Sequence, residues 1–302
     1  MTTTARLAAG AALSALAFAS FAMPGVHAAD DVRAMWIGRT NLMSPQSIDD
    51  ALASAKRENY NTVLVQARAR GDAYFLKGIE PRPVALSSLP AFDPLAESIA
   101  KGHARGLSVH AWINVNLVAG TEAPGSRTHI VYRHPEWLMV PRQIADDLKS
   151  LDPDGPEYLG RLMRYSRSQA AVLEGVYLSP ATPGAVEYTA GIVRDIVQRY
   201  AVDGVHFDYV RYPNDDFDYG RETLRVFGQN PSTAPDRWRQ FRADRLTALL
   251  TTLRGVVKEA RPSAIVSASQ DAAWPQGLLD TILRRTPEPS ADTLKASTTS
   301  SF

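Results

Sequence analysis

The sequence predicts an α/β fold of the (β/α) barrel kind that is incomplete at its carboxyl end. Short runs of β-branched and aromatic residues recur along the chain, and segments with helical spacing of apolar residues lie between them. This alternation is typical of a parallel sheet covered by helices. The pattern stops after about residue 270, so we expect fewer than eight strands.

Residues 1–28 have the features of a secretory signal peptide. A positive charge at Arg6 precedes an apolar stretch, and the segment ends in the small-x-small pattern at Ala28. We expect cleavage after Ala28, no membrane anchor, and a secreted or periplasmic protein. The chain has no cysteine, which excludes a disulfide framework and lipidation of the lipoprotein kind.

The barrel domain is expected to span residues 29–270, with its first three strands at 32–38, 61–67 and 108–114. The first connecting helix should begin at Ser44-Pro45 and the second at Asp93-Pro94, because proline is favoured in the first helical turn. Residues 116–183 form an unusually long irregular region, which we expect to be functional or partly disordered.

Helical spacing resumes after Thr182-Pro183 and leads into a fourth strand at residues 205–210. A charged helix over about 236–260 and a fifth strand at 264–267 follow. Only 302 − 268 = 34 residues remain after Ala268, too few for three more strand and helix pairs of about thirty residues each. Residues 271–302, rich in Ser, Thr and Pro, are expected to be an atypical disordered tail.

The charge of the chain is nearly balanced, with 33 Lys and Arg against 32 Asp and Glu. This balance gives no electrostatic reason to expect nucleic acid or an anionic membrane as a partner. A neutral or mixed-charge substrate fits the composition better.

Asp208 is the main candidate for chemistry, because catalytic groups of parallel α/β folds lie at the carboxyl ends of strands. Strand alternation places His206 and Asp208 on one face, and Arg211 and Tyr212 follow the strand. Apolar and aromatic neighbours make a carboxylate costly there unless it is paired. The alternative is a structural ion pair with Arg211 or Arg68.

The second and third strands also end in polar groups. Arg68 and Asp72 follow the second strand, where they could hold a substrate hydroxyl or carboxylate or belong to an ordinary solvated loop. Trp112 and Asn114 share a face of the third strand. Together they suit a sugar, although a core tryptophan and a turn-forming asparagine explain them equally well.

Two further groups have simpler interpretations. His110, His206 and Asp208 could form a zinc set on neighbouring strands, but no His-x-His or HExxH motif accompanies them, so we predict no metal and no other cofactor. Asp215, Asp216 and Asp218 are expected to form a solvated acidic turn, with the alternative that one of them faces the substrate.

Several motifs in order resemble the glycosyl hydrolase-like family 10. They are RAMWI at 33–37, VQAR at 65–68, GDAY at 71–74, HAWIN at 110–114, HPEW at 134–137, YLSP at 177–180 and DGVHFDYVRYP at 203–213. The resemblance implies a TIM-barrel glycosidase relative with a polysaccharide or oligosaccharide substrate and Asp208 as its catalytic residue. By the same resemblance, the sugar would be bound by Arg68, Asp72, Trp112, Asn114, His206, Arg211 and Tyr212.

Glycoside hydrolysis needs a second carboxyl group as proton donor. Asp271, just past the fifth strand, is the candidate by analogy with amylase-like barrels. The sequence therefore predicts a glycoside hydrolase of a bacterial envelope or extracellular glycan. The alternatives are a non-catalytic glycan-binding barrel and an inactive, truncated gene product.

Overall fold

The computed structural model describes residues 31–269. The chain divides into two units, Met1–Asp31 and Val32–Phe302, and every element below belongs to the second. The predicted signal peptide at 1–28, the predicted tail at 271–302 and Asp271 lie outside the described residues.

A five-stranded parallel sheet forms the centre of the fold, and it confirms the predicted α/β class. The sheet order is β1-β2-β3-β6-β7, so each strand pairs with its predecessor in chain order, as in a barrel of β/α units. All five predicted strands are present. They are β1 Ala34–Ile37, β2 Thr62–Arg68, β3 Ser108–Asn114, β6 Gly204–Asp208 and β7 Ile265–Ala268.

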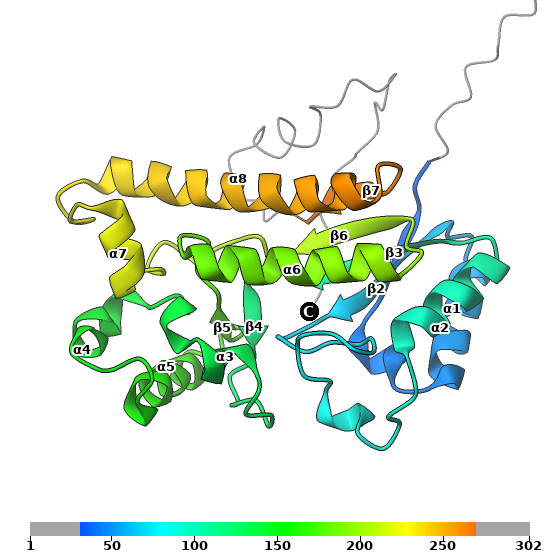
Figure 1. Ribbon diagram of the computed structural model, residues 1–302, viewed down its shortest axis with the longest axis horizontal. Coiled ribbons are helices and arrows are strands. Elements are labelled where there is room, and N and C mark those ends of the chain that lie inside the picture. The colour runs from blue at the N-terminus through cyan, green and yellow to red at the C-terminus, as the bar shows by residue number, and fades with distance from the viewer. Residues whose placement is uncertain (1–30, 270–302) are drawn as a thin grey trace, which may run out of the picture. The chain divides into compact units, whose positions relative to one another are not determined.

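The four predicted helices connect these strands, and the first three begin at the predicted signals. The side chains of Ser44 and Asp93 accept hydrogen bonds from the Ser47 and Ala96 N–H groups, which caps α1 and α2. In Figure 1, α6 and α8 run side by side over the sheet. The helices are α1 Pro45–Arg57, α2 Pro94–Ala104, α6 Pro183–Arg199 and α8 Pro235–Ala260.

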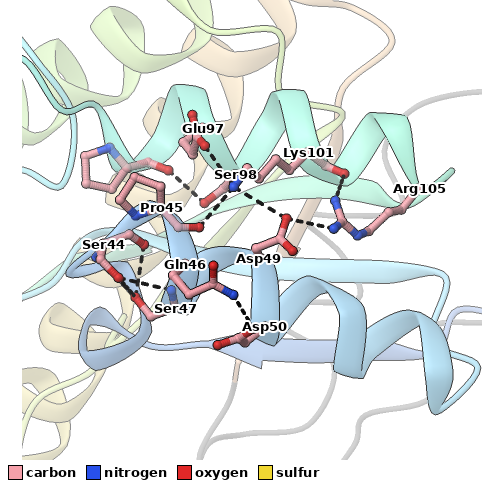
Figure 2. Close-up of polar contacts among 11 residues, drawn as sticks. Ser44, Pro45, Gln46, Ser47, Asp49, Asp50, Glu97, Ser98, Lys101 and Arg105 are labelled. Carbon is pink, nitrogen blue, oxygen red and sulfur yellow. Dashed lines mark hydrogen bonds and ion pairs between the residues drawn. The ribbon is translucent and has the colours of Figure 1, made fainter.

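Polar contacts join α1 to α2 (Figure 2). Arg105 donates to the Asp49 carboxylate at 2.7 Å, and Lys101 donates to the Pro45 carbonyl at 3.0 Å. These partly exposed pairs add little energy each. They fix how the two helices lie against each other at the start of the sheet.

The two faces of the sheet differ in chemistry. One face packs against the helices and forms the main core, which includes Ile37, Val65, Ile113, Phe207 and Leu253. Because neighbouring residues of a strand point to opposite faces, the other face carries the polar and aromatic side chains of the strands. The candidate site lies on this polar face, at the carboxyl ends of β3 and β6.

The region from 116 to 183 contains helices and strands, so the expectation of an irregular, partly disordered chain was wrong, while the alternative of a functional region stays a prediction. We call residues 117–178 the inserted unit. It has its own apolar cluster, in which Tyr158, Leu162 and Leu178 are buried. Its elements are β4 Leu117–Ala119, α3 Ile130–Arg133, η3 Pro135–Trp137, η4 Arg142–Ile144, α4 Ala145–Lys149, α5 Pro156–Ser168 and β5 Val176–Tyr177. Most of these elements are too short for periodicity to reveal them, but α5, with 13 residues, is as long as α1 and was missed.

Three more short helices were not predicted. They are η1 Arg39–Leu42, η2 Val84–Leu86 and α7 Arg221–Phe227. None of the helices within the described part of the chain is both long and apolar enough to cross a membrane.

Candidate active site

Asp208 ends β6 and is held by three hydrogen-bond donors. The Trp112 indole Nε1 donates to Oδ2 at 3.1 Å, the Tyr209 backbone N–H donates to Oδ1 at 2.8 Å, and the Ser269 hydroxyl also donates to Oδ1. The side chain is only partly buried. An ionised carboxylate accepts all three bonds, so the site presents an oriented anionic oxygen pair at the end of the strand.

The backbone turns sharply after Asp208. Tyr209 has a φ of 54°, in the left-handed region that non-glycine residues seldom adopt. The end of β3 holds this turn, because the Val115 and Asn116 N–H groups donate to the carbonyls of Asp208 and Tyr209 at 2.7 and 3.2 Å. A strained residue fixed in this way is typical of functional sites.

Glu174, which the sequence analysis missed, lies beside this turn. Its carboxylate accepts a hydrogen bond from the Tyr209 hydroxyl and a 2.9 Å bond from Arg211. Burial raises the pKa of Tyr177 far above its ordinary value. The charges of Glu174 and Asp208 raise this pKa further, and the charge of Arg211 lowers it. Glu174 and Asp208 thus share one electrostatic environment. Glu174 precedes a strand of only two residues, which leaves no periodic signal around it.

Arg68 is completely buried and bonded entirely to the protein. Its guanidinium forms two bonds with the Glu80 carboxylate, at 2.7 and 2.8 Å, and donates to the carbonyls of Asn114 and Val115 at 2.5 and 2.9 Å. Arg68 therefore has no exposed surface for a sugar, and it fixes the end of β3 next to the turn that follows Asp208.

Asp72 lies on the loop after β2. Burial raises the pKa of its carboxyl, which accepts a 2.8 Å bond from the Arg70 N–H. Gly71 has a φ of 69°, and a Cβ there would lie 2.6 Å from the His129 ring. Burial lowers the pKa of His129, whose Nε2 lies 2.8 Å from the Arg70 carbonyl. The loop is thus closely packed around Asp72.

An aromatic group lines the polar face of the sheet next to Asp208. Trp36 packs edge-on against Trp112 and His206, with ring centroids 4.5 and 4.6 Å away, and Trp36 is 40% exposed. Burial lowers the pKa values of His110 and His206 to about 4, so both rings are neutral at physiological pH. His206 Nδ1 lies 2.9 Å from the Ser267 hydroxyl.

The remaining predicted site residues divide into near and distant ones. Asn114 is opposite Asp208 in the strand register, and its Oδ1 is buried without a hydrogen-bond partner in the described chain. Arg211 contacts Glu174 beside the turn. Tyr212 points away from the site, because its buried hydroxyl donates to the Arg242 carbonyl of α8 at 3.2 Å.

The turn after β6 is only partly solvated, as the buried Asp218 shows. Asp215 is exposed, whereas Asp218 is completely buried and accepts bonds from the Ser179 and Thr223 hydroxyls, each at 3.0 Å. The expectation of a solvated Asp218 was wrong, because sequence alone did not show these two donors. Within residues 31–269, no three His, Asp or Glu side chains come together as a metal site.

Comparisons with known proteins agree with this fold. The family described as "Glycosyl hydrolase-like 10" matches residues 31–294. Glycosyl hydrolase DigH of Escherichia coli (strain K12) is 25% identical over 280 residues, which cover 83% of this chain and 56% of DigH. Glycosyl hydrolase YngK of Bacillus subtilis (strain 168) is 22% identical over 267 residues, which cover 81% of this chain and 46% of YngK. The chain spans about half the length of these curated relatives.

Two solved structures share the fold. The PgaB (BpsB) glycoside hydrolase domain from Bordetella bronchiseptica has a TM-score of 0.52 at 16% identity, over 79% of this chain and 65% of that domain. Alpha-L-fucosidase isoenzyme 2 from Paenibacillus thiaminolyticus has a TM-score of 0.51 at 19% identity, over 75% of this chain and 29% of the fucosidase. These likenesses support a TIM-barrel type of fold, of which the five-stranded sheet is an incomplete form.

Proposed function

The chain belongs to the glycosyl hydrolase-like 10 family, and on that premise we propose that it is a glycoside hydrolase acting on a bacterial envelope or extracellular glycan. The observation that carries this proposal is the Asp208 carboxylate at the end of β6, oriented by donors from three places in the chain. Export by the segment 1–28 would bring the protein to such a glycan.

Asp208 is assigned to the anomeric centre of the sugar. As the sugar–oxygen bond breaks, positive charge develops on the ring, and a carboxylate on one face stabilises or attacks it. The Trp112, Tyr209 and Ser269 donors keep the Asp208 oxygens in place before the substrate arrives. Such preorganisation lowers the barrier, because the site need not reorient as charge develops.

The proton donor to the leaving oxygen is a separate group. Glu174 already accepts bonds from Tyr209 and Arg211 and interacts with both as a carboxylate, so we assign it to holding the turn after β6. Asp271, three residues past the end of β7, stays our candidate for the acid.

The aromatic group beside Asp208 supports a sugar as substrate. Trp36 exposes part of its ring on the polar face of the sheet. Trp112 packs against Trp36 and donates a hydrogen bond to the Asp208 carboxylate. An indole ring covers the apolar face of a pyranose, while polar groups at the strand ends fix the hydroxyls. The near-neutral charge of the chain also suits an uncharged glycan.

Reducing-end release from purified envelope glycans and soluble oligosaccharides tests the proposal. The chain without residues 1–28 should cleave one of them, and Asp208→Asn should abolish cleavage while the exposed-residue variant Asp154→Asn retains it. Full activity of Asp208→Asn on a cleaved substrate would exclude the assigned role. Saccharide binding without turnover, unchanged in Asp208→Asn, would instead indicate a non-catalytic glycan-binding barrel.

A further inference from the structure

A cavity between the inserted unit and α7 lies apart from Asp208. It has a volume of about 610 Å³, which is within the range of small-molecule sites. None of the residues that bond Asp208 lines it. Its walls come from the inserted unit, from the start of α6 and from α7, so elements distant in sequence meet there.

Two hydroxyl groups line its walls, and one of them is buried without a hydrogen-bond partner within residues 31–269. Thr182 is 4% exposed, and its Oγ1 makes no hydrogen bond within residues 31–269. Thr182 precedes α6 without capping it, so its hydroxyl serves no helix end. Tyr158 also lines the cavity, and its side chain is 5% exposed. A buried polar group without a partner is costly, and a ligand hydroxyl would satisfy it.

The rest of the lining indicates an uncharged ligand with an apolar side. Three acidic side chains, Glu136, Asp146 and Glu222, are balanced by three basic ones, Lys149, Arg221 and Arg225. Trp137, Tyr219 and several aliphatic side chains provide apolar walls between them. A pyranose has this combination of apolar faces and a rim of hydroxyls.

The cavity is firmly built and accessible. Arg221 donates to the carbonyls of Lys149 and Leu151 at 2.6 and 3.0 Å, which joins α7 to the end of α4. The Trp137 ring stacks on His134 at 3.7 Å and contacts Gly184 at the start of α6. Asp146, Lys149 and Arg225 are exposed, so the cavity reaches the surface.

We propose that this cavity is a second carbohydrate-binding site, which takes one or two neutral pyranose units through the Thr182 and Tyr158 hydroxyls. It would hold a distant part of a glycan, or a separate saccharide, while Asp208 acts elsewhere. The inference does not depend on hydrolysis at Asp208.

Binding of cellobiose and N,N′-diacetylchitobiose tests the site, with the Asp208→Asn chain used so that neither probe is consumed. One of them should bind with a dissociation constant on the order of 1 mM and shift the backbone amide resonances of Gly184 and Gly220. The resonances of residues around the substituted position should shift less. Absence of shifts at Gly184 and Gly220 with both probes at about 10 mM would overturn the proposal.

Removal of the two hydroxyls tests the assigned contacts. Thr182→Val with Tyr158→Phe should weaken binding about tenfold, since each lost bond contributes modestly. Ser166→Ala is the matched control, because Ser166 is equally buried on α5, has an unpartnered Oγ and does not line the cavity. Equal affinity of the double variant and the control would refute the contacts. If the double variant does not fold, the amide shifts of the parent chain decide the question.

Discussion

The Trp112 indole donates to the Asp208 carboxylate over 3.1 Å, and the two residues lie on neighbouring parallel strands. Trp112→Phe keeps a ring beside Trp36 but removes this donor. Hydrogen bonds to charged groups contribute about 1.5–3 kcal/mol, so kcat on a cleaved glycan should fall between about tenfold and a hundredfold. The melting temperature should change little. A change in KM alone would show that Trp112 only binds substrate.

Glu174→Gln removes the negative charge beside Arg211 and Tyr209. We expect kcat to fall severalfold, because the turn that follows Asp208 loses its anchor. The free energy of unfolding should change by less than about 1 kcal/mol, as for other exposed pairs. Glu122→Gln is the control, since Glu122 forms an exposed pair with Arg167. Equal kcat values of the two variants would exclude a positioning role for Glu174.

Arg68→Met should destabilise the fold strongly. It leaves the buried Glu80 carboxylate without its cation and the Asn114 carbonyl without its donor, a loss of about 3–5 kcal/mol. Urea unfolding measures this. Arg68→Met combined with Glu80→Met should recover part of the loss, because no buried charge remains. A double variant less stable than Arg68→Met would contradict this account.

Asp218 should make stability depend on pH. Burial raises the pKa of its carboxyl from 3.8 to about 6, although the Ser179 and Thr223 hydroxyls lower it. The folded state therefore binds more protons than the unfolded state in this range. The stability that the protonated Asp218 carboxyl contributes is fully present below the unfolded-state pKa of 3.8 and is lost as the pH rises through about 6. The total loss is about 3 kcal/mol.

Urea unfolding at about pH 4 and pH 7.5 measures this effect. Asp218→Asn should remove that part of the pH dependence, while Asp154→Asn, at an exposed position, should keep it. An identical pH profile for the parent chain and Asp218→Asn would rule out the assignment.

The sequence predicted the long, regular elements well and the short ones poorly. The five strands and four helices carry periodic apolar residues and recognisable helix starts such as Ser44-Pro45. Most strands and helices of the inserted unit are too short to give a periodic pattern, although the amphipathic helix α5, with 13 residues, was missed as well.

The candidate site was predictable only in part. Strand alternation predicted that His206 and Asp208 share a face, but the Trp112 to Asp208 bond depends on strand register, which sequence does not supply. Glu80, the partner of Arg68, comes from a loop twelve residues away. Likewise, Glu174 meets Arg211 only through tertiary packing.

The separate apolar cluster of the inserted unit has an evolutionary consequence. Substitutions among Tyr158, Leu162 and their neighbours alter one cluster, while Phe207 and Val65 stabilise the sheet in another. Substitutions confined to this cluster therefore need not disturb the strand that bears Asp208, whereas Leu117, Met139, Leu173 and Tyr177 of the same unit belong to the main core. The walls of the cavity can thus diverge in descendants of this chain while the carboxylate at the end of β6 is kept.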